Sequence, residues 1–190
     1  MDKYKKVRLI TKKRFNEFQT YFRGFAPPEA SDLLEKARLD WLYELTKTLD
    51  IWQTNYYTNG NLTDGELILG YANLGALVEG WMKIFYSAYI LDYEADTDIK
   101  IINPKTKELY EVENLKFETL KQYSVEKLFK KSDTMYNWIC IIQARRNIIH
   151  AFKDKDLGKA EDFIKNIDIY CEFVLLVNNR IPHINHRNTM

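Results

Sequence analysis

The stretch 64-DGELILGYANLGALVEGWMKIFYSAYIL-91 predicts a long helix at the centre of the fold. Its apolar residues recur at steps of three and four, from Leu67 through Trp81 to Leu91, which is the spacing of one face of an α-helix. Asp64 is the expected N-terminal cap, because an aspartate carboxylate can accept hydrogen bonds from the first turn of a helix. The pattern therefore indicates a helix over most of this stretch.

Three glycines, Gly70, Gly75 and Gly80, lie inside this pattern. In the interior of a helix each glycine costs about 1 kcal/mol relative to alanine. Glycines at such spacing often allow neighbouring helices to approach closely. We therefore expect the helix that carries them to be packed on several sides.

Similar spacing predicts further helices on both sides of this stretch. Longer helices are expected to begin at Ser31, at Asp133 (continuing to about residue 152) and at Asp156, and short ones are expected near 114–122 and 124–131. Only 7 glycines and 4 prolines occur in 190 residues, about half the usual share. So few breakers favour long helices over a many-turned all-β fold. The sequence therefore predicts an all-α helical bundle.

Two segments depart from this helical pattern. The segment 99–112 has two β-prone arms around 103-NPKT-106, which predicts a small β-hairpin inserted between helices. Residues 1–25 form a basic N-terminal arm, which is either a solvated lead-in or a phosphate-contacting segment. We expect residues 1–190 to form a single domain, with the bundle over 30–180.

Composition excludes several classes of protein. The 28 Lys and Arg nearly balance the 27 Asp and Glu, which argues against a histone-like or acidic-tail protein. A hydrophobic share of 46% argues against a wholly disordered chain. No window is long and apolar enough for a signal peptide or a membrane span, so a cytoplasmic protein without membrane contact is expected. No Cys/His cluster has metal-ligand spacing, so zinc is not supported, and the expectation is a site without metal or cofactor.

The segment 143-QARRNIIHAFKDKD-156 does not have the pattern of a plain core helix. On a wheel of about 100° per residue, Arg145 lies on the same apolar stripe as Trp138 and Ile149. Arg146 and His150 then lie one turn apart at the edge of that stripe. A buried arginine without a partner is costly. Arg145 therefore needs a carboxylate such as Glu79, a place at a subunit interface, or a pocket that receives an anion.

These residue types are suited to phosphate chemistry. The planar fork of an arginine matches the oxygens of a phosphate, and a histidine moves protons near neutral pH. Without a metal, such a pair can cleave a phosphodiester, because the imidazole transfers the proton while the guanidinium stabilises charge on the phosphate oxygens. The plain alternative is a structural salt-bridge hub at the end of a helix.

The run 145-RRNIIH-150 resembles the signature of the HEPN superfamily (higher eukaryotes and prokaryotes nucleotide-binding domains), which is an Arg, four to six residues and a His on a late helix of a bundle. The resemblance implies a homodimer in which two such helices face each other across one cleft. It further implies a metal-independent endoribonuclease of a defence or toxin system, with RNA as substrate and an antitoxin as partner. Arg145 and His150 would be catalytic, and Arg146 and Asn147 would bind phosphate or hold His150 in orientation. Lys153, just after the motif, either extends the phosphate-binding track or belongs to a solvated face.

Other members of this superfamily have lost catalysis and serve as binding or assembly modules. The second hypothesis is therefore a catalytically silent HEPN-like module with a structural Arg–His pair. In that case Arg145 would be tied to an internal carboxylate such as Glu79. The hairpin and the basic arm are not part of the common HEPN core.

Overall fold

A computed structural model describes residues 3–20, 23–150 and 154–183 of the chain. Within these residues it contains the helices α1 (Lys3–Thr20), α2 (Pro28–Lys36), α3 (Leu39–Asn59), α4 (Asp64–Ala88), α5 (Ile90–Ala95), α6 (Phe117–Tyr123), α7 (Thr134–Arg146) and α8 (Ala160–Arg180), and the 3-10 turns η1 (Ile99–Ile101), η2 (Val112–Asn114) and η3 (Asn147–His150). The β-pairing found in the described ranges is limited to isolated bridges. The prediction of an all-α bundle is thus confirmed.

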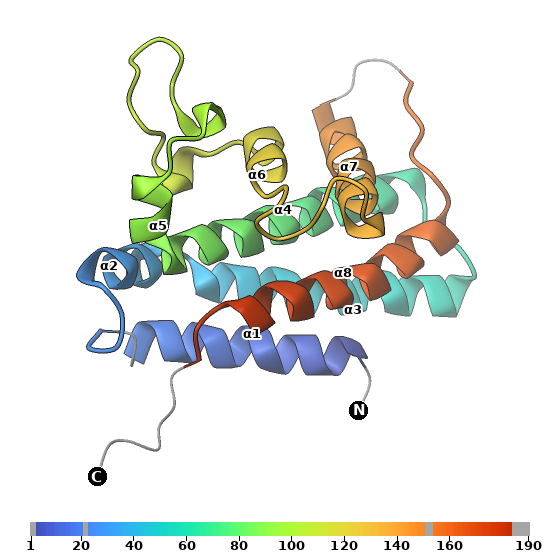
Figure 1. Cartoon of the computed structure of the whole chain (residues 1–190). Coiled ribbons are helices and arrows are strands. Elements are labelled where there is room, and N and C mark those ends of the chain that lie inside the picture. The colour runs from blue at the N-terminus through green and yellow to red at the C-terminus, as the bar shows by residue number, and fades with distance from the viewer. Residues whose placement is uncertain (1–2, 21–22, 151–153, 184–190) are drawn as a thin grey trace.

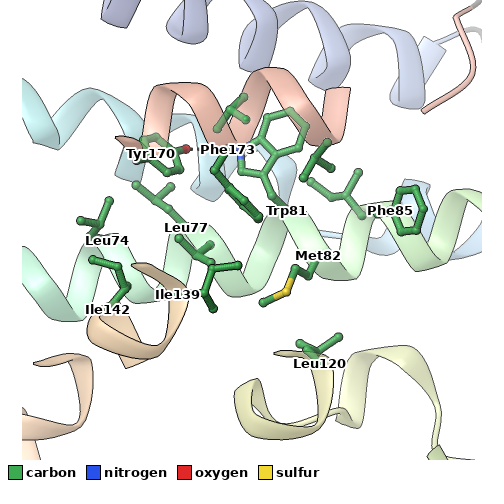
Figure 2. Packing of buried hydrophobic residues seen from close by; sticks show 14 of the residues in the cluster. Leu74, Leu77, Trp81, Met82, Phe85, Leu120, Ile139, Ile142, Tyr170 and Phe173 are labelled. Carbon is green, nitrogen blue, oxygen red and sulfur yellow. Dashed lines mark hydrogen bonds between the residues drawn. The ribbon is translucent and has the colours of Figure 1, made fainter. Parts of the chain in front are cut away.

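Helix α4 lies at the centre of the bundle, as predicted, between α7 on one side and α3 and α8 on the other (Figure 1). Figure 2 shows Leu77 and Trp81 of α4 packed towards Tyr170 and Phe173 of α8, with Ile139 of α7 nearby. The indole Nε1 of Trp81 donates a hydrogen bond of 3.3 Å to the Tyr170 hydroxyl. Because α4 is buried on several sides, it carries much of the apolar contact that stabilises the fold.

Three of the four glycines of α4, those at 70, 75 and 80, each contact a side chain from a different helix. A Cβ at Gly70 would lie 2.6 Å from the Phe163 ring of α8, and one at Gly80 would lie 2.6 Å from Leu42 of α3. At Gly75 the nearest atom is Cγ of Arg146 of α7, at 2.5 Å. Successive glycines five residues apart point about 140° apart around a helix. This spacing explains how one helix can accommodate three neighbours.

Gly70→Ala is expected to lower the free energy of unfolding by about 1–3 kcal/mol, because the added methyl group overlaps the buried Phe163 ring. The matched control is Gly65→Ala in the first turn of α4, where a Cβ meets nothing within 4 Å. Urea unfolding followed by circular dichroism measures both. Equal stability of the two variants would contradict the close contact between α4 and α8.

The cap of α4 is Thr63 and not Asp64, which is the first helical residue. Glu66 Oε2 accepts a hydrogen bond of 2.8 Å from the Thr63 amide, and Thr63 Oγ1 accepts one of 3.3 Å from the Glu66 amide. Such a reciprocal capping box satisfies two backbone donors at once. Hydrogen bonds to its carboxylate from the Thr63 amide, the Asn55 side chain and the Thr63 hydroxyl hold the pKa of Glu66 below its ordinary value.

The basic N-terminal segment is a helix of the bundle, which corrects the prediction of an arm. Tyr4, Val7, Thr11, Arg14 and Phe18 are buried on one face of α1, and this helix packs against α3 and α8 (Figure 1). Their steps of three and four residues are the ordinary helical spacing. The dense lysines conceal this stripe, since they occupy the exposed face of the same helix.

Several predicted helix boundaries are wrong. The helix expected from Ser31 is interrupted at Ala37, whose extended backbone separates α2 from α3, and Ser31 lies inside α2. The expected helix near 124–131 is a turn with a bridge between Val125 and Phe129. Helix α8 begins at Ala160, four residues after Asp156. Local spacing correctly predicts helical residues after Ser31 and after Asp156 but not the ends of those helices, and it wrongly predicts a helix near 124–131.

The predicted β-hairpin over 99–112 is not formed. A single antiparallel bridge joins Ile102 to Leu109, and η1 and η2 flank the loop on its two sides. The loop tip is closed by Asn103, whose side-chain oxygen accepts a hydrogen bond of 2.9 Å from the Lys105 amide. An isolated two-stranded ribbon has little stability of its own. Here Ile101 and Val112 are buried in the core, and each belongs to a 3-10 turn and not to a strand.

Candidate functional site

The Arg–His motif lies where α7 ends. The α-helix stops at Arg146, and the Asn147 amide bonds back to the carbonyl oxygens of Gln143 and Arg145. Residues 147–150 continue as the 3-10 turn η3, at the outer edge of the molecule (Figure 1). A wheel of 100° per residue therefore does not apply beyond Arg146. As a result Ile149, expected on the buried stripe, is 43% exposed.

Arg145 turns inward, as its position on the stripe predicts, and its side chain is only 14% exposed. Its Nη1 donates a hydrogen bond of 2.5 Å to the Tyr71 hydroxyl of α4. Its Nη2 lies 3.9 Å from Oδ2 of Asp156, a side chain that is 87% exposed. The guanidinium is thus held mainly by the uncharged Tyr71 hydroxyl. Among the described residues, the one carboxylate within 4 Å of it is that of Asp156, which lies at the edge of this distance and is solvent-exposed.

Glu79 pairs with Arg146 and not with Arg145, which corrects the predicted partner. The distance from Arg146 Nη2 to Glu79 Oε2 is 3.0 Å, and Glu79 also binds Lys83 at 3.0 Å. The stem of Arg146 lies against Gly75, and its guanidinium is 5.8 Å from the centroid of Phe117. One step around α7 separates the two arginines, so only Arg146 faces the side of α4 that carries Glu79.

The remaining predicted site residues differ in position. Asn147 and His150 are both exposed, and Asn147 also caps α7 through its backbone. In the described part of the chain no hydrogen bond joins His150 to Arg145. Lys153 lies outside the described residues. The end of α7 therefore combines Arg145, which is bound to a hydroxyl, Arg146, which is paired with a carboxylate, and the solvent-exposed imidazole of His150.

Sequence reasoning missed Gly158, which forms one wall of the Arg145 site. Its backbone has a φ of +73°, and a Cβ there would lie 2.3 Å from Nη2 of Arg145. Its amide donates a hydrogen bond of 2.9 Å to Oδ1 of Asp156. A glycine between an aspartate and a helix start is the signal that could have indicated this turn.

Gly158→Ala is expected to destabilise the protein by about 0.5–1.5 kcal/mol more than Gly60→Ala, because the added methyl group displaces the Arg145 guanidinium from its hydrogen bond to Tyr71. Gly60 has nearly the same φ, +74°, but a Cβ there meets nothing within 4 Å. In both variants the left-handed backbone of the new alanine costs about 1–2 kcal/mol. Only Gly158→Ala also displaces Arg145. Urea unfolding of the two variants gives the difference, and a difference near zero would contradict the packing of Arg145 on Gly158.

Tyr71 and Asn166, which are both buried, were also missed. The Tyr71 hydroxyl accepts hydrogen bonds from Arg145 and from Asn166 Nδ2, the latter at 3.1 Å. Burial raises the pKa of Tyr71, and the neighbouring Arg145 and Asn166 offset part of that rise, so the hydroxyl stays uncharged. Tyrosine at a helical core position is ordinary, and nothing in the sequence distinguishes this one.

The chemistry that this arrangement allows is recognition of an anion. A guanidinium that is mostly buried but not neutralised by a close carboxylate attracts negative charge strongly.

In the ranges 3–20, 23–150 and 154–183, no group of three or more His, Cys, Asp or Glu side chains could hold a metal ion. In the same ranges, no helix has the length and apolarity that crossing a membrane requires.

Comparison of the chain with protein-family models, with curated proteins and with solved structures gives no significant match.

Proposed function

We propose that this protein is a HEPN-like, metal-independent endoribonuclease that acts as a homodimer. In this proposal the ends of two α7 helices meet, and both copies of Arg145 and His150 line one cleft that receives RNA. A defence or toxin role with an antitoxin protein as partner is the biological setting that the HEPN resemblance implies.

The observation that carries the proposal is the contrast between the two adjacent arginines. Arg146 is paired with Glu79 at 3.0 Å, whereas the nearest carboxylate oxygen to Arg145, among the described residues, is that of Asp156 at 3.9 Å. The charge of Arg145 is thus available to a phosphate group. An exposed histidine, His150, follows five residues later on the adjoining 3-10 turn.

The reaction is attack of a ribose 2′-hydroxyl on the adjacent phosphorus. The 2′-oxygen forms the new bond to phosphorus, and the bond to the 5′-oxygen breaks. His150 of one or the other protomer takes the 2′-proton or gives a proton to the leaving 5′-oxygen, and water exchanges the other of these two protons. Arg145 stabilises the negative charge that builds on the phosphorane oxygens. Arg146 and Asn147 bind flanking phosphates or keep His150 in place.

The experiment is cleavage of a structured RNA by the purified full chain in EDTA, beside an identical oligonucleotide with 2′-deoxyribose throughout. The proposal expects cuts in the RNA alone, leaving 2′,3′-cyclic phosphate and 5′-hydroxyl ends, because the 2′-hydroxyl is the nucleophile. Absence of cleavage, or cleavage of the deoxy substrate as well, would refute it.

A second candidate, the catalytically silent module, is favoured by one observation. The Arg145 side chain is 14% exposed and lies between Tyr71 and Gly158, which suits a structural role. This candidate expects the protein to leave RNA intact while the Arg145–Tyr71 contact contributes to stability. The cleavage experiment separates the two candidates directly.

A further inference from the structure

We propose that Tyr71, held by a buried chain of Asn166 and Trp138, is the positioning residue that fixes the guanidinium of Arg145 for phosphate. The inference rests on the proposed ribonuclease function and adds to it a residue that the HEPN motif does not contain. The chain of contacts joins three helices, since Tyr71 is on α4, Asn166 is on α8, and both Trp138 and Arg145 are on α7.

The direction of every hydrogen bond in this chain is determined by chemistry. Trp138 Nε1 lies 2.9 Å from Asn166 Oδ1, and an indole N–H can only donate. The Asn166 amide nitrogen must therefore face Tyr71, to which it donates at 3.1 Å. Arg145 also can only donate, so the Tyr71 oxygen accepts two hydrogen bonds.

The surroundings of Tyr71 keep its hydroxyl in one place. Tyr71, Trp138 and Asn166 are all buried. The Tyr71 ring meets the Phe163 ring edge-on, with centroids 4.9 Å apart and planes at 75°. An aromatic side chain packed in this way has little rotational freedom. The acceptor that Tyr71 presents to Arg145 is consequently fixed by the core and not by solvent.

An uncharged acceptor suits a positioning role better than a carboxylate does. A carboxylate such as Glu79 both orients an arginine and cancels its charge, as it does for Arg146 at 3.0 Å. Tyr71 orients Arg145 through one Nη while the positive charge remains. Gly158 bounds the guanidinium on the side of Nη2, so Arg145 is confined without being neutralised.

The test compares Tyr71→Phe with Tyr170→Phe. Tyr170 is a matched control because it is also buried at the contact of α4 with α8, and its hydroxyl also accepts a hydrogen bond from a side-chain N–H group, the indole of Trp81 at 3.3 Å. We expect Tyr71→Phe to lower kcat for RNA cleavage about 10- to 100-fold, because a misplaced catalytic group is costly. KM should change less than about 2-fold, and Tyr170→Phe should leave both constants within about 2-fold.

A second readout does not require cleavage. The Nε–Hε resonance of Arg145, assigned by its loss in Arg145→Lys, reports the order of the guanidinium by NMR. It should be sharp in the native protein and in Tyr170→Phe, and broadened or shifted in Tyr71→Phe.

The outcomes separate this inference from the proposed function. If the native protein cleaves RNA and Tyr71→Phe cleaves as well as Tyr170→Phe, the inference is overturned while the ribonuclease stands. If the native protein does not cleave, the proposed function fails, and the NMR readout decides whether Tyr71 orients Arg145. An Arg145 resonance unchanged in Tyr71→Phe overturns the inference in either case.

Discussion

Arg14→Met is expected to lower the free energy of unfolding by about 3–5 kcal/mol, the usual cost of breaking a buried charged network. The Arg14 side chain is 3% exposed and lies 3.1 Å from Glu17 Oε2. It also donates to the carbonyl oxygens of Asn178, Ile181 and Pro182 at 2.8–3.2 Å. A domain has only about 5–15 kcal/mol of stability in total, so this loss is a large share of it.

The physical reason is that Arg14 satisfies the C-terminal end of α8. The last carbonyls of a helix have no partners within the helix, and here a guanidinium from α1 supplies donors to them. Burial lowers the pKa of Arg14, and Glu17 offsets part of that effect. Methionine fills similar volume but leaves both the carbonyl groups and the Glu17 carboxylate without this donor.

Arg8→Met is the matched control for this prediction. Arg8 lies on the same helix and pairs with Asp50 at 2.6 Å, but both side chains are more than a third exposed, at 35% and 43%. Exposed pairs of this kind contribute about 0–1 kcal/mol. Urea unfolding followed by circular dichroism measures both variants. Equal losses for Arg8→Met and Arg14→Met would show that Arg14 does not anchor α8.

His150→Ala is expected to reduce RNA cleavage about 10²- to 10⁴-fold, the usual contribution of a general acid or base. The imidazole is solvent-exposed at the end of η3, so its removal should leave the fold unchanged by circular dichroism. His186→Ala, a histidine outside the described residues, is the control and should cleave normally. If His150→Ala cleaves as fast as the native protein, His150 is not part of the site.

Mixing two inactive variants tests the dimer. If a site combines Arg145 of one protomer with His150 of the other, mixed dimers of Arg145→Ala and His150→Ala contain one intact site and regain part of the activity. Mixtures that stay inactive would place each Arg and His pair within one protomer, or would show that no dimer forms. Size-exclusion chromatography with light scattering separates these last two cases.

The sequence by itself determined the class of the fold and its central helix. Apolar residues at steps of three and four were sufficient for α4 and for the existence of α8, because this periodicity is local and every residue involved is close in the chain. The end of α7 was less well predicted, since the change to a 3-10 turn after Arg146 leaves no clear mark in the sequence.

Only the tertiary structure decided how the charged residues are used. The basic residues 3–14 conceal a buried helix face. Arg14 is fixed by hydrogen bonds to Asn178 and Pro182, which lie 164 and 168 positions further along the chain. Tyr71, 74 residues from Arg145, and not Glu79, holds that arginine. Periodicity determines which side of a helix is buried, whereas the partner of a buried charge depends on the rotation and offset of two helices in contact, which no local pattern specifies.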